Sequence, residues 1–369
     1  MNDANFLEQL KKSGGVFESA EADATAASSP VFNNGVLTGD PAQSVTSFGD
    51  VAAEYQALTA GVGLADFSRR TQIEMQGVDR AAFLHNLCTN QIRDLKPGAG
   101  CEAFLTNAQG HILALVNVFC RADSLVLETV PNQEAKILAQ LDRYLIREKV
   151  ELLARSGAWA ELLLAGPEAE SLLKGLGCEL PGALLEHRSA MIGAISVEVR
   201  RVDVTIGGGY LVTCERAPLA DLWARLIEAG AKPCGAIAVD RARIEAGTPY
   251  YGPDISDKNL PQEIARDARA ISFVKGCYIG QETVARIDAL GHVNRTLAGV
   301  RFAADANPTP GVELAADGKT VGMVTSAAFS PRLDSPLALA YVRRGSNAAG
   351  TQLQSPIGAA EVVSLPLAR

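Results

Sequence analysis

Residues 73–87 read IEMQGVDRAAFLHNL, and residues 162–176 read LLLAGPEAESLLKGL. Each stretch runs from a strand-like segment, through a glycine, into a helix-like segment with an acidic start. A second strand-then-helix pair, residues 124–145, has its counterpart in residues 209–229 at a similar offset. This spacing predicts two copies of one unit of about 85 to 90 residues, each ordered strand, helix, strands, helix, strand.

The order of elements suits a ferredoxin-like split βαβ arrangement, so an α+β fold with a crevice between the two copies is expected. We predict a first lobe at 46–155 and a second lobe at 156–290, the latter with an irregular Gly- and Pro-rich arm. Residues 1–45 are rich in Ala, Ser, Asp and Asn without a period, which predicts a flexible N-terminal arm. Short alternating runs separated by turns predict a β-barrel at 296–369.

The composition is that of an ordinary globular protein. The 369 residues are 47% apolar and 21% charged, and they exceed what one hydrophobic core needs. The formal net charge of −8 argues against a general nucleic-acid-binding surface. No N-terminal apolar core resembles a signal peptide, and no run approaches the roughly 20 apolar residues of a membrane span. We therefore expect a cytoplasmic protein that does not bind a membrane.

Seven cysteines are scattered along the chain with no Cys-x-x-Cys pair and no metal-type spacing to the four histidines, so no metal site is expected. Cys277 differs from the other six because it lies in residues 275–286, which read KGCYIGQETVAR. If a helix begins near Gly280, Cys277 precedes its N-terminus, where the helix dipole and Lys275 would favour a thiolate. Cys277 and Lys275 are therefore the candidate catalytic residues.

The same run resembles the Lys-Gly-Cys-Phe/Tyr-x-Gly-Gln-Glu signature of the YgfZ family. The matching residues are Lys275, Gly276, Cys277, Tyr278, Gly280, Gln281 and Glu282, and Arg286 closes the run. The resemblance implies that the cysteine is the functional centre. It also implies a folate-dependent role in the assembly or repair of iron–sulfur enzymes, including tRNA methylthiolation, with such enzymes or cluster-assembly proteins as partners.

The rest of the ordered chain resembles the glycine-cleavage T-protein, an aminomethyltransferase. The segments that carry this likeness include residues 63–67, 243–247, 251–254 and 325–331. It implies a cloverleaf of two ferredoxin-like lobes and a C-terminal β-barrel around a pocket for tetrahydrofolate or a derivative. Asn117 and Tyr210 are the candidate folate contacts on this basis.

The departures from the T-protein pattern bear on the chemistry. Where T-proteins read Gly-Gly-Ile-Ile-Asp-Asp, this chain reads GHILAL at residues 110–115. Neither Ala114 nor Leu115 can transfer a proton or stabilise an iminium charge, so glycine-cleavage activity is not expected. The acid and the arginine that hold folate in T-proteins fall on Leu211 and Val239.

Three functions remain open at this point. The first is a folate-binding helper of iron–sulfur enzymes that acts through Cys277. The second is a folate-dependent one-carbon enzyme, an aminomethyltransferase or a demethylase, in which Cys277 is incidental. The third is a tRNA-binding or scaffold protein, which the net charge of −8 disfavours.

Overall fold

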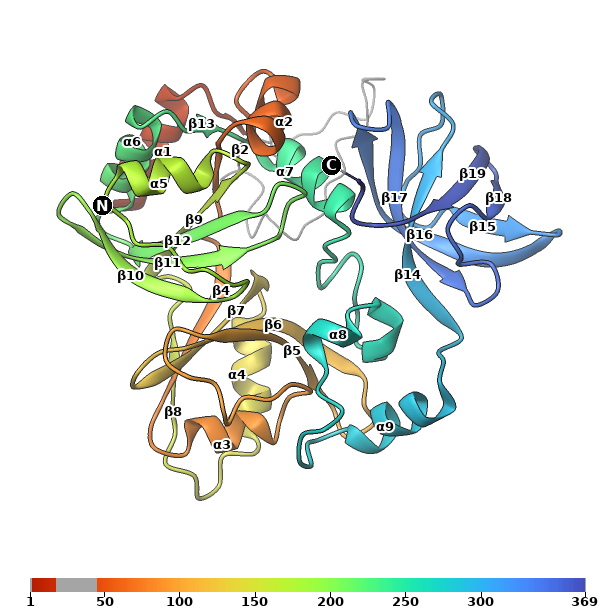
Figure 1. Cartoon of the computed structure of the whole chain (residues 1–369), viewed down its shortest axis with the longest axis horizontal. Coiled ribbons are helices and arrows are strands. Elements are labelled where there is room, and N and C mark those ends of the chain that lie inside the picture. The colour runs from red at the N-terminus through yellow and green to blue at the C-terminus, as the bar shows by residue number, and fades with distance from the viewer. Residues whose placement is uncertain (1, 18–44, 369) are drawn as a thin grey trace. The chain divides into compact units, whose positions relative to one another are not determined.

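The computed structural model describes residues 2–17 and 45–368 (Figure 1). The described chain divides into two compact units that interleave in sequence. The first contains described residues up to 72, together with 130–132 and 154–243. The second contains residues 73–129, 133–153 and those from 244 onward.

The first unit is built on a six-stranded sheet with the strand order β10-β11-β12-β9-β3-β13. Its strands are β3 (Gly63–Asp66), β9 (Trp159–Ala165), β10 (His187–Ile192), β11 (Ile195–Val202), β12 (Gly209–Glu215) and β13 (Lys232–Pro233). The helices of this unit are α1 (Asn2–Lys12), α2 (Val51–Ala60), α5 (Ala169–Gly175), α6 (Leu219–Glu228) and most of α7 (Ala236–Ala246). A separate two-stranded sheet pairs β1 (Val16–Phe17) with β2 (Val45–Ser47).

A five-stranded sheet with the order β5-β6-β7-β4-β8 forms the second α+β element. Its strands are β4 (Arg70–Gln76), β5 (Gly100–Thr106), β6 (Ile112–Cys120), β7 (Ser124–Pro131) and β8 (Glu151–Ala154). The helices α3 (Arg80–His85) and α4 (Glu134–Asp142) come after β4 and β7.

The two sheets confirm the predicted duplication. In the smaller sheet, β4 comes before the first helix and lies between β7 and β8. In the larger sheet, its counterpart β9 lies between β12 and β13, with β3 inserted next to β9. The glycines that marked the repeat are equivalent as well. Gly77 has a φ of +104° and Gly166 a φ of +112°, and a Cβ would lie 2.0 Å from Lys149 O and 2.4 Å from Gly61 O respectively. Only glycine fits such positions.

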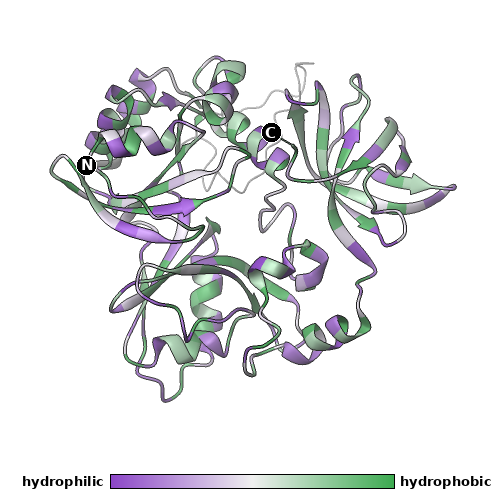
Figure 2. Ribbon diagram, in the orientation of Figure 1, coloured by the Kyte–Doolittle hydropathy of each residue, from purple (hydrophilic) through white to green (hydrophobic). Residues whose placement is uncertain are grey.

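Each sheet packs its apolar face on helices, and hydrophobic residues run along the strands (Figure 2). The core of the first unit includes α1, whose Phe6 contacts Trp223 edge-on at a centroid distance of 5.7 Å. Residues 2–12 thus form a packed helix, in contrast to the flexible arm predicted for 1–45, and residues 18–44 of that arm lie outside the described residues. The apolar pair at Phe6 and Leu10, one helical turn apart, is the reason.

The segment from α2 to β3 also differs from the sequence expectation. It was assigned to the first lobe at 46–155, yet β3 pairs antiparallel with β9 and parallel with β13. Strand pairing over such sequence distances is set by tertiary packing and leaves no local pattern.

The C-terminal part of the second unit is a closed barrel with the order β14-β17-β16-β15-β18-β19, as predicted. Its strands are β14 (Arg295–Phe302), β15 (Glu313–Ala316), β16 (Lys319–Ser330), β17 (Ser335–Arg343), β18 (Gln352–Ser355) and β19 (Gly358–Val363). Between α7 and the barrel lie the 3-10 helix η2 (Pro261–Ile264), α8 (Asp267–Ala270) and α9 (Gln281–Leu290). The fold class of two α+β lobes and a C-terminal β-barrel is confirmed. Among the described residues, no helix is long and apolar enough to cross a membrane.

Candidate functional site

Cys277 lies in a turn formed by residues 272–280, between α8 and α9 of the second unit. Its side chain is exposed, whereas Cys101 is half-buried and the five remaining cysteines are buried. Burial raises the pKa of all six of these thiols, and it raises the pKa of Cys214 and of Cys234 to about 12. These six thiols are therefore protonated near neutral pH, and Cys277 is the accessible one.

Lys275 anchors the turn through its ammonium group. Nζ donates to the backbone carbonyls of His85 at 2.5 Å, Cys88 at 2.6 Å and Asn90 at 2.8 Å. An ammonium has three hydrogens, so this set uses its whole donor capacity. Burial lowers the pKa of Lys275, but the three carbonyl oxygens favour the charged form. The side chain that was predicted to support a Cys277 thiolate thus points into the protein and holds the loop at 85–90.

Backbone contacts add to this anchoring. Ile279 N–H donates to Asn86 O at 3.0 Å, and the Thr106 hydroxyl donates to Ile279 O at 2.6 Å. Ser272 N–H donates to Thr89 O at 2.9 Å. The turn is therefore held at both ends along one neighbouring loop, so Cys277 is presented by a rigid segment and not by a free arm.

Gly280 sets the start of α9, as expected from the sequence. It has a φ of +83°, and a Cβ would lie 2.5 Å from Asn107 O and 2.8 Å from the Cα of Gly110. The turn between β5 and β6 therefore packs directly on the backbone of Gly280. Any other residue here would push α9 away from the sheet.

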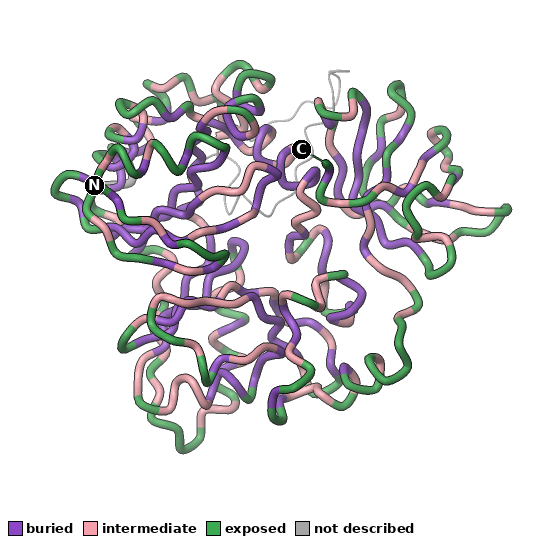
Figure 3. Tube along the Cα trace, viewed as in Figure 1, coloured by how far each residue is buried: buried purple, intermediate pink, exposed green. Residues whose placement is uncertain are grey.

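The remaining signature residues divide into buried and exposed positions. Tyr278 is buried, with Lys275 Nζ 4.8 Å from the centre of its ring. Gln281 is half-buried, while Glu282 and Arg286 are exposed on α9, most of which is exposed (Figure 3). Tyr278 and Lys275 therefore support the turn, and Glu282 and Arg286 lie on the exposed face of α9.

Two apolar side chains precede Lys275 on the same turn. Val274 is 96% exposed and Phe273 is 46% exposed. The sequence pattern had not pointed to them, nor to His85, whose side chain borders Gly276. His85 ends α3, and its proximity to the turn depends on a contact between residues nearly 200 positions apart. No local motif signals such a contact.

Strand β6 carries the positions at which the T-protein acids are missing. Ala114 is fully buried in the core of the sheet. Leu115 and Asn117 alternate with it and lie on the opposite face, where both are half-buried. Asn117 Nδ2 donates to Glu128 Oε2 at 2.8 Å, and Glu128 is fully buried. This face therefore combines one apolar side chain with a buried amide–carboxylate pair.

Tyr210 belongs to the first unit, where it lies on β12 in the core between the sheet and its helices. Burial raises the pKa of its phenol. Leu211 is fully buried, and Val239 contributes to a pocket of the same unit that is also lined by Asp66, Phe67, Arg69 and Trp223. Burial also raises the pKa of Asp66.

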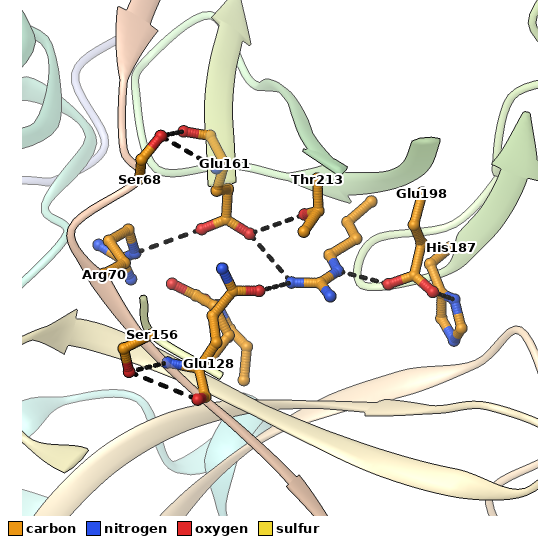
Figure 4. Close-up of polar contacts among 11 residues, drawn as sticks. Ser68, Arg70, Glu128, Ser156, Glu161, His187, Glu198 and Thr213 are labelled. Carbon is orange, nitrogen blue, oxygen red and sulfur yellow. Dashed lines mark hydrogen bonds and ion pairs between the residues drawn. The ribbon is translucent and has the colours of Figure 1, made fainter. Parts of the chain in front are cut away.

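A buried polar network occupies the face of the first unit's sheet opposite α5 and α6 (Figure 4). Arg200 donates to Glu161 at 2.9 Å and to Glu198 at 2.7 Å. The Thr213 hydroxyl donates to Glu161 at 3.0 Å, and His187 Nδ1 lies 3.3 Å from Glu198. Each of these charges has a partner, as burial requires. The charged groups on this face are therefore paired with one another.

Both parts of the chain match known domain families. The GCVT N-terminal domain matches residues 8–274, and the glycine cleavage T-protein C-terminal barrel domain matches residues 295–368. The chain belongs to the glycine-cleavage T-protein family. It is 30% identical over 328 residues to an aminomethyltransferase of Symbiobacterium thermophilum, which covers 83% of this chain and 85% of that protein. A Geobacillus kaustophilus aminomethyltransferase is 29% identical over 335 residues, covering 87% and 91%.

A solved structure has the same fold. The aminomethyltransferase T of the glycine cleavage system from Bartonella henselae matches with a TM-score of 0.83 and 21% identity, covering 97% of this chain and 96% of that one. The first matched domain ends at residue 274 and the second begins at residue 295, so most of the Cys277 turn and all of α9 lie between them. No cluster of metal-ligating side chains occurs within the residues that the structure describes.

Proposed function

We propose that this chain is a tetrahydrofolate-dependent protein of one-carbon chemistry. The proposal rests on the face of β6 that carries Leu115 and Asn117. This face belongs to a chain that matches the T-protein family over both of its domains. Relatives named aminomethyltransferase support the same reaction class.

The residues on this face fit a folate. The edge of its pterin ring presents adjacent N–H donors and a carbonyl acceptor, which a carboxylate and an amide can bind. Asn117, which is half-buried, would meet that edge, and the fully buried Glu128 behind it would fix the orientation of the Asn117 amide through the 2.8 Å bond. When bound, tetrahydrofolate supplies the nitrogen atoms that accept or donate the one-carbon unit. Tyr210 fits less well because its ring is enclosed in the core of the first unit.

The substrate is not the aminomethylated carrier of glycine cleavage in this proposal. An acid at position 115 would face the same side as Asn117, but Leu115 offers no charge to balance a cationic amine. The favoured donor is an N-methylated amine whose intact methyl group passes to a nitrogen of tetrahydrofolate: the amine N–CH3 bond breaks, a folate N–CH3 bond forms, the folate N–H proton goes to the amine, and no oxidant is needed.

Calorimetry with tetrahydrofolate tests the first part. We expect binding by the wild type, and affinity at least about tenfold weaker for Glu128→Gln and Asn117→Ala. Asp123→Asn, an exposed change in the turn between β6 and β7, is the matched control and should bind normally. A folded sample without binding at about 1 mM ligand would remove folate from the proposal. Turnover of aminomethylated carrier protein at the rate of a T-protein would contradict the second part.

A second function is favoured by the Cys277 turn. We propose that the exposed thiol supports iron–sulfur enzymes, as the likeness of residues 275–286 to the YgfZ signature implies. The anchored turn and the neighbouring exposed Val274 and Phe273 suit a thiol that meets a partner protein. The location of Cys277 between the two matched domains supports a function added to the T-protein fold.

Complementation tests this second function. Cells that lack the protein would receive wild type, Cys277→Ala, Cys277→Ser or the control Cys101→Ser, and iron–sulfur enzymes including tRNA methylthiolation would be assayed. We expect both Cys277 variants to fail and the control to succeed. Full restoration by Cys277→Ser would rule out sulfur chemistry at this position. Folate binding by purified Cys277→Ala should be normal, so the two proposals can fail separately.

A further inference from the structure

His85 faces the Cys277 turn with one ring nitrogen. The residue is 3% exposed, and its Nδ1 accepts the backbone N–H of Ile92 at 3.4 Å. Burial lowers the pKa of the imidazole, and the positive charges of Lys275 and Arg93 lower it further. The negative charge of Asp94 acts in the opposite direction and is a smaller effect. A neutral ring that accepts at Nδ1 carries its proton on Nε2.

Nε2 is directed at the backbone beside Cys277. A Cβ built on Gly276 would lie 3.9 Å from His85 Nε2, with no other heavy atom of the described residues within 4 Å apart from its own chain neighbours. Nε2 has no hydrogen-bond partner among the described residues, and because it is not one of their fully buried polar atoms, it is the edge of the ring that stays open to solvent. An N–H donor that is open to solvent beside an exposed thiol can donate to that sulfur.

Gly276 is explained by the same contact. Its φ lies outside the left-handed region that favours glycine, and a methyl group would meet His85 only at ordinary contact distance. Neither backbone strain nor a clash therefore requires glycine at this position. What the absent side chain provides is an open edge of the imidazole, one residue away from the exposed Cys277.

We propose that His85 Nε2–H is the hydrogen-bond donor to the sulfur of Cys277 in its anionic form, so that His85, Gly276 and Cys277 make one site. A donor aimed at a thiolate stabilises it relative to the thiol and raises its population near neutral pH. This replaces Lys275 as the support of the thiolate, because the Lys275 ammonium is committed to three carbonyls. The inference rests on the second proposed function, sulfur chemistry at Cys277.

Alkylation of Cys277 by iodoacetamide as a function of pH tests the pair, with the modified peptide identified by mass. His85→Phe keeps an aromatic ring of similar size but removes the donor. We expect its alkylation rate at pH 7 to fall about tenfold and its pH profile to move upward by about one unit, with the same plateau at high pH. His85→Gln, which restores an N–H donor, should recover much of the rate.

Gly276→Ala provides the decisive second variant, since it leaves His85 in place and puts a methyl group against Nε2. It should slow alkylation at pH 7 while leaving the thermal unfolding temperature close to wild type. The proposal would be overturned if the pH profiles of Cys277 alkylation in His85→Phe and Gly276→Ala coincided with that of the wild type. A lower alkylation rate at the high-pH plateau would also overturn it, because that result reports blocked access to the thiol and not loss of thiolate stabilisation. The assay needs no iron–sulfur enzyme. Failure of Cys277→Ala to affect such enzymes would therefore refute the function and leave the His85–Cys277 pair standing.

Discussion

Replacing Lys275 by methionine isolates the role of its ammonium group. Methionine keeps an unbranched apolar stem in the buried site but removes the three donors. The carbonyl oxygens of His85, Cys88 and Asn90 then lose partners at 2.5, 2.6 and 2.8 Å. The loop at 85–90 and the turn at 272–280 would lose their main connection.

The magnitude follows from two opposing effects. A hydrogen bond to a charged group contributes about 1.5–3 kcal/mol, and three of them are broken. Against this, the substitution removes the cost of burying an ammonium group, which is several kcal/mol before compensation. We expect a net loss of about 2–4 kcal/mol in the free energy of unfolding, because three acceptors are left unsatisfied in a site where Lys275 is only 8% exposed.

Hydrogen exchange locates the effect. The amides of Ser272 and Ile279 donate to Thr89 O and Asn86 O, so their protection reports whether the turn stays on the loop. We expect both amides to exchange much faster in Lys275→Met, alongside the lower stability in urea. Lys258→Met, at an exposed position of the same unit, is the control and should change stability by no more than about 0.5 kcal/mol.

Unchanged protection of Ser272 and Ile279 in Lys275→Met, with unchanged unfolding in urea, would refute the anchoring argument. Loss of stability with normal protection at these two amides would also count against it, since the defect would then lie elsewhere. Only a loss that includes the turn agrees with three carbonyl bonds made by Lys275.

Three further outcomes are expected. Burial, and to a lesser extent the charge of Asp288, raises the pKa of Asp267 to about 6, so the ionisation of Asp267 lowers stability as pH rises from about 4 to 6. Asp267→Asn should therefore raise the free energy of unfolding at pH 8 by about 1 kcal/mol, after allowance for the partial exposure of this side chain. Unfolding in urea at pH 4 and pH 8 checks this. The lowered pKa of His85 means that the unfolded chain binds its proton first, so stability should fall as pH drops below about 6.5, less steeply in His85→Phe. Phe6→Ala should cost about 3–5 kcal/mol by removing a buried ring from Trp223, and α1 should then exchange its amides faster.

Features with a local physical cause could be predicted from the sequence. The repeat was visible because Gly77 and Gly166 both adopt a positive φ that other residues avoid. The start of α9 followed from Gly280, and the barrel followed from alternating runs between turns. The pairing of β3 with β9 and the packing of α1 were not predicted. They depend on partners far away in sequence, and nothing local records them.

Lys275 shows the same limit at the scale of one side chain. Its closeness to Cys277 in sequence suggested that its charge would act on the thiol. In the structure the side chain turns away to the carbonyls of the loop at 85–90. Sequence spacing predicted which residue types gather at the turn, but the direction of each side chain depends on acceptors that the spacing does not reveal.

The way the turn is anchored also bears on the role of His85. Lys275 and Ile279 bind backbone atoms of the loop at 85–90, so the anchoring places no demand on the side chains of that loop. The Asn90 side chain is used otherwise, since it donates to Glu102 O at 2.7 Å and to Arg269 O at 2.8 Å. The imidazole of His85 is left facing Gly276 with a free Nε2–H. Packing and anchoring are thus satisfied without that donor, so His85→Phe tests its proposed role at the Cys277 thiol while the turn stays anchored.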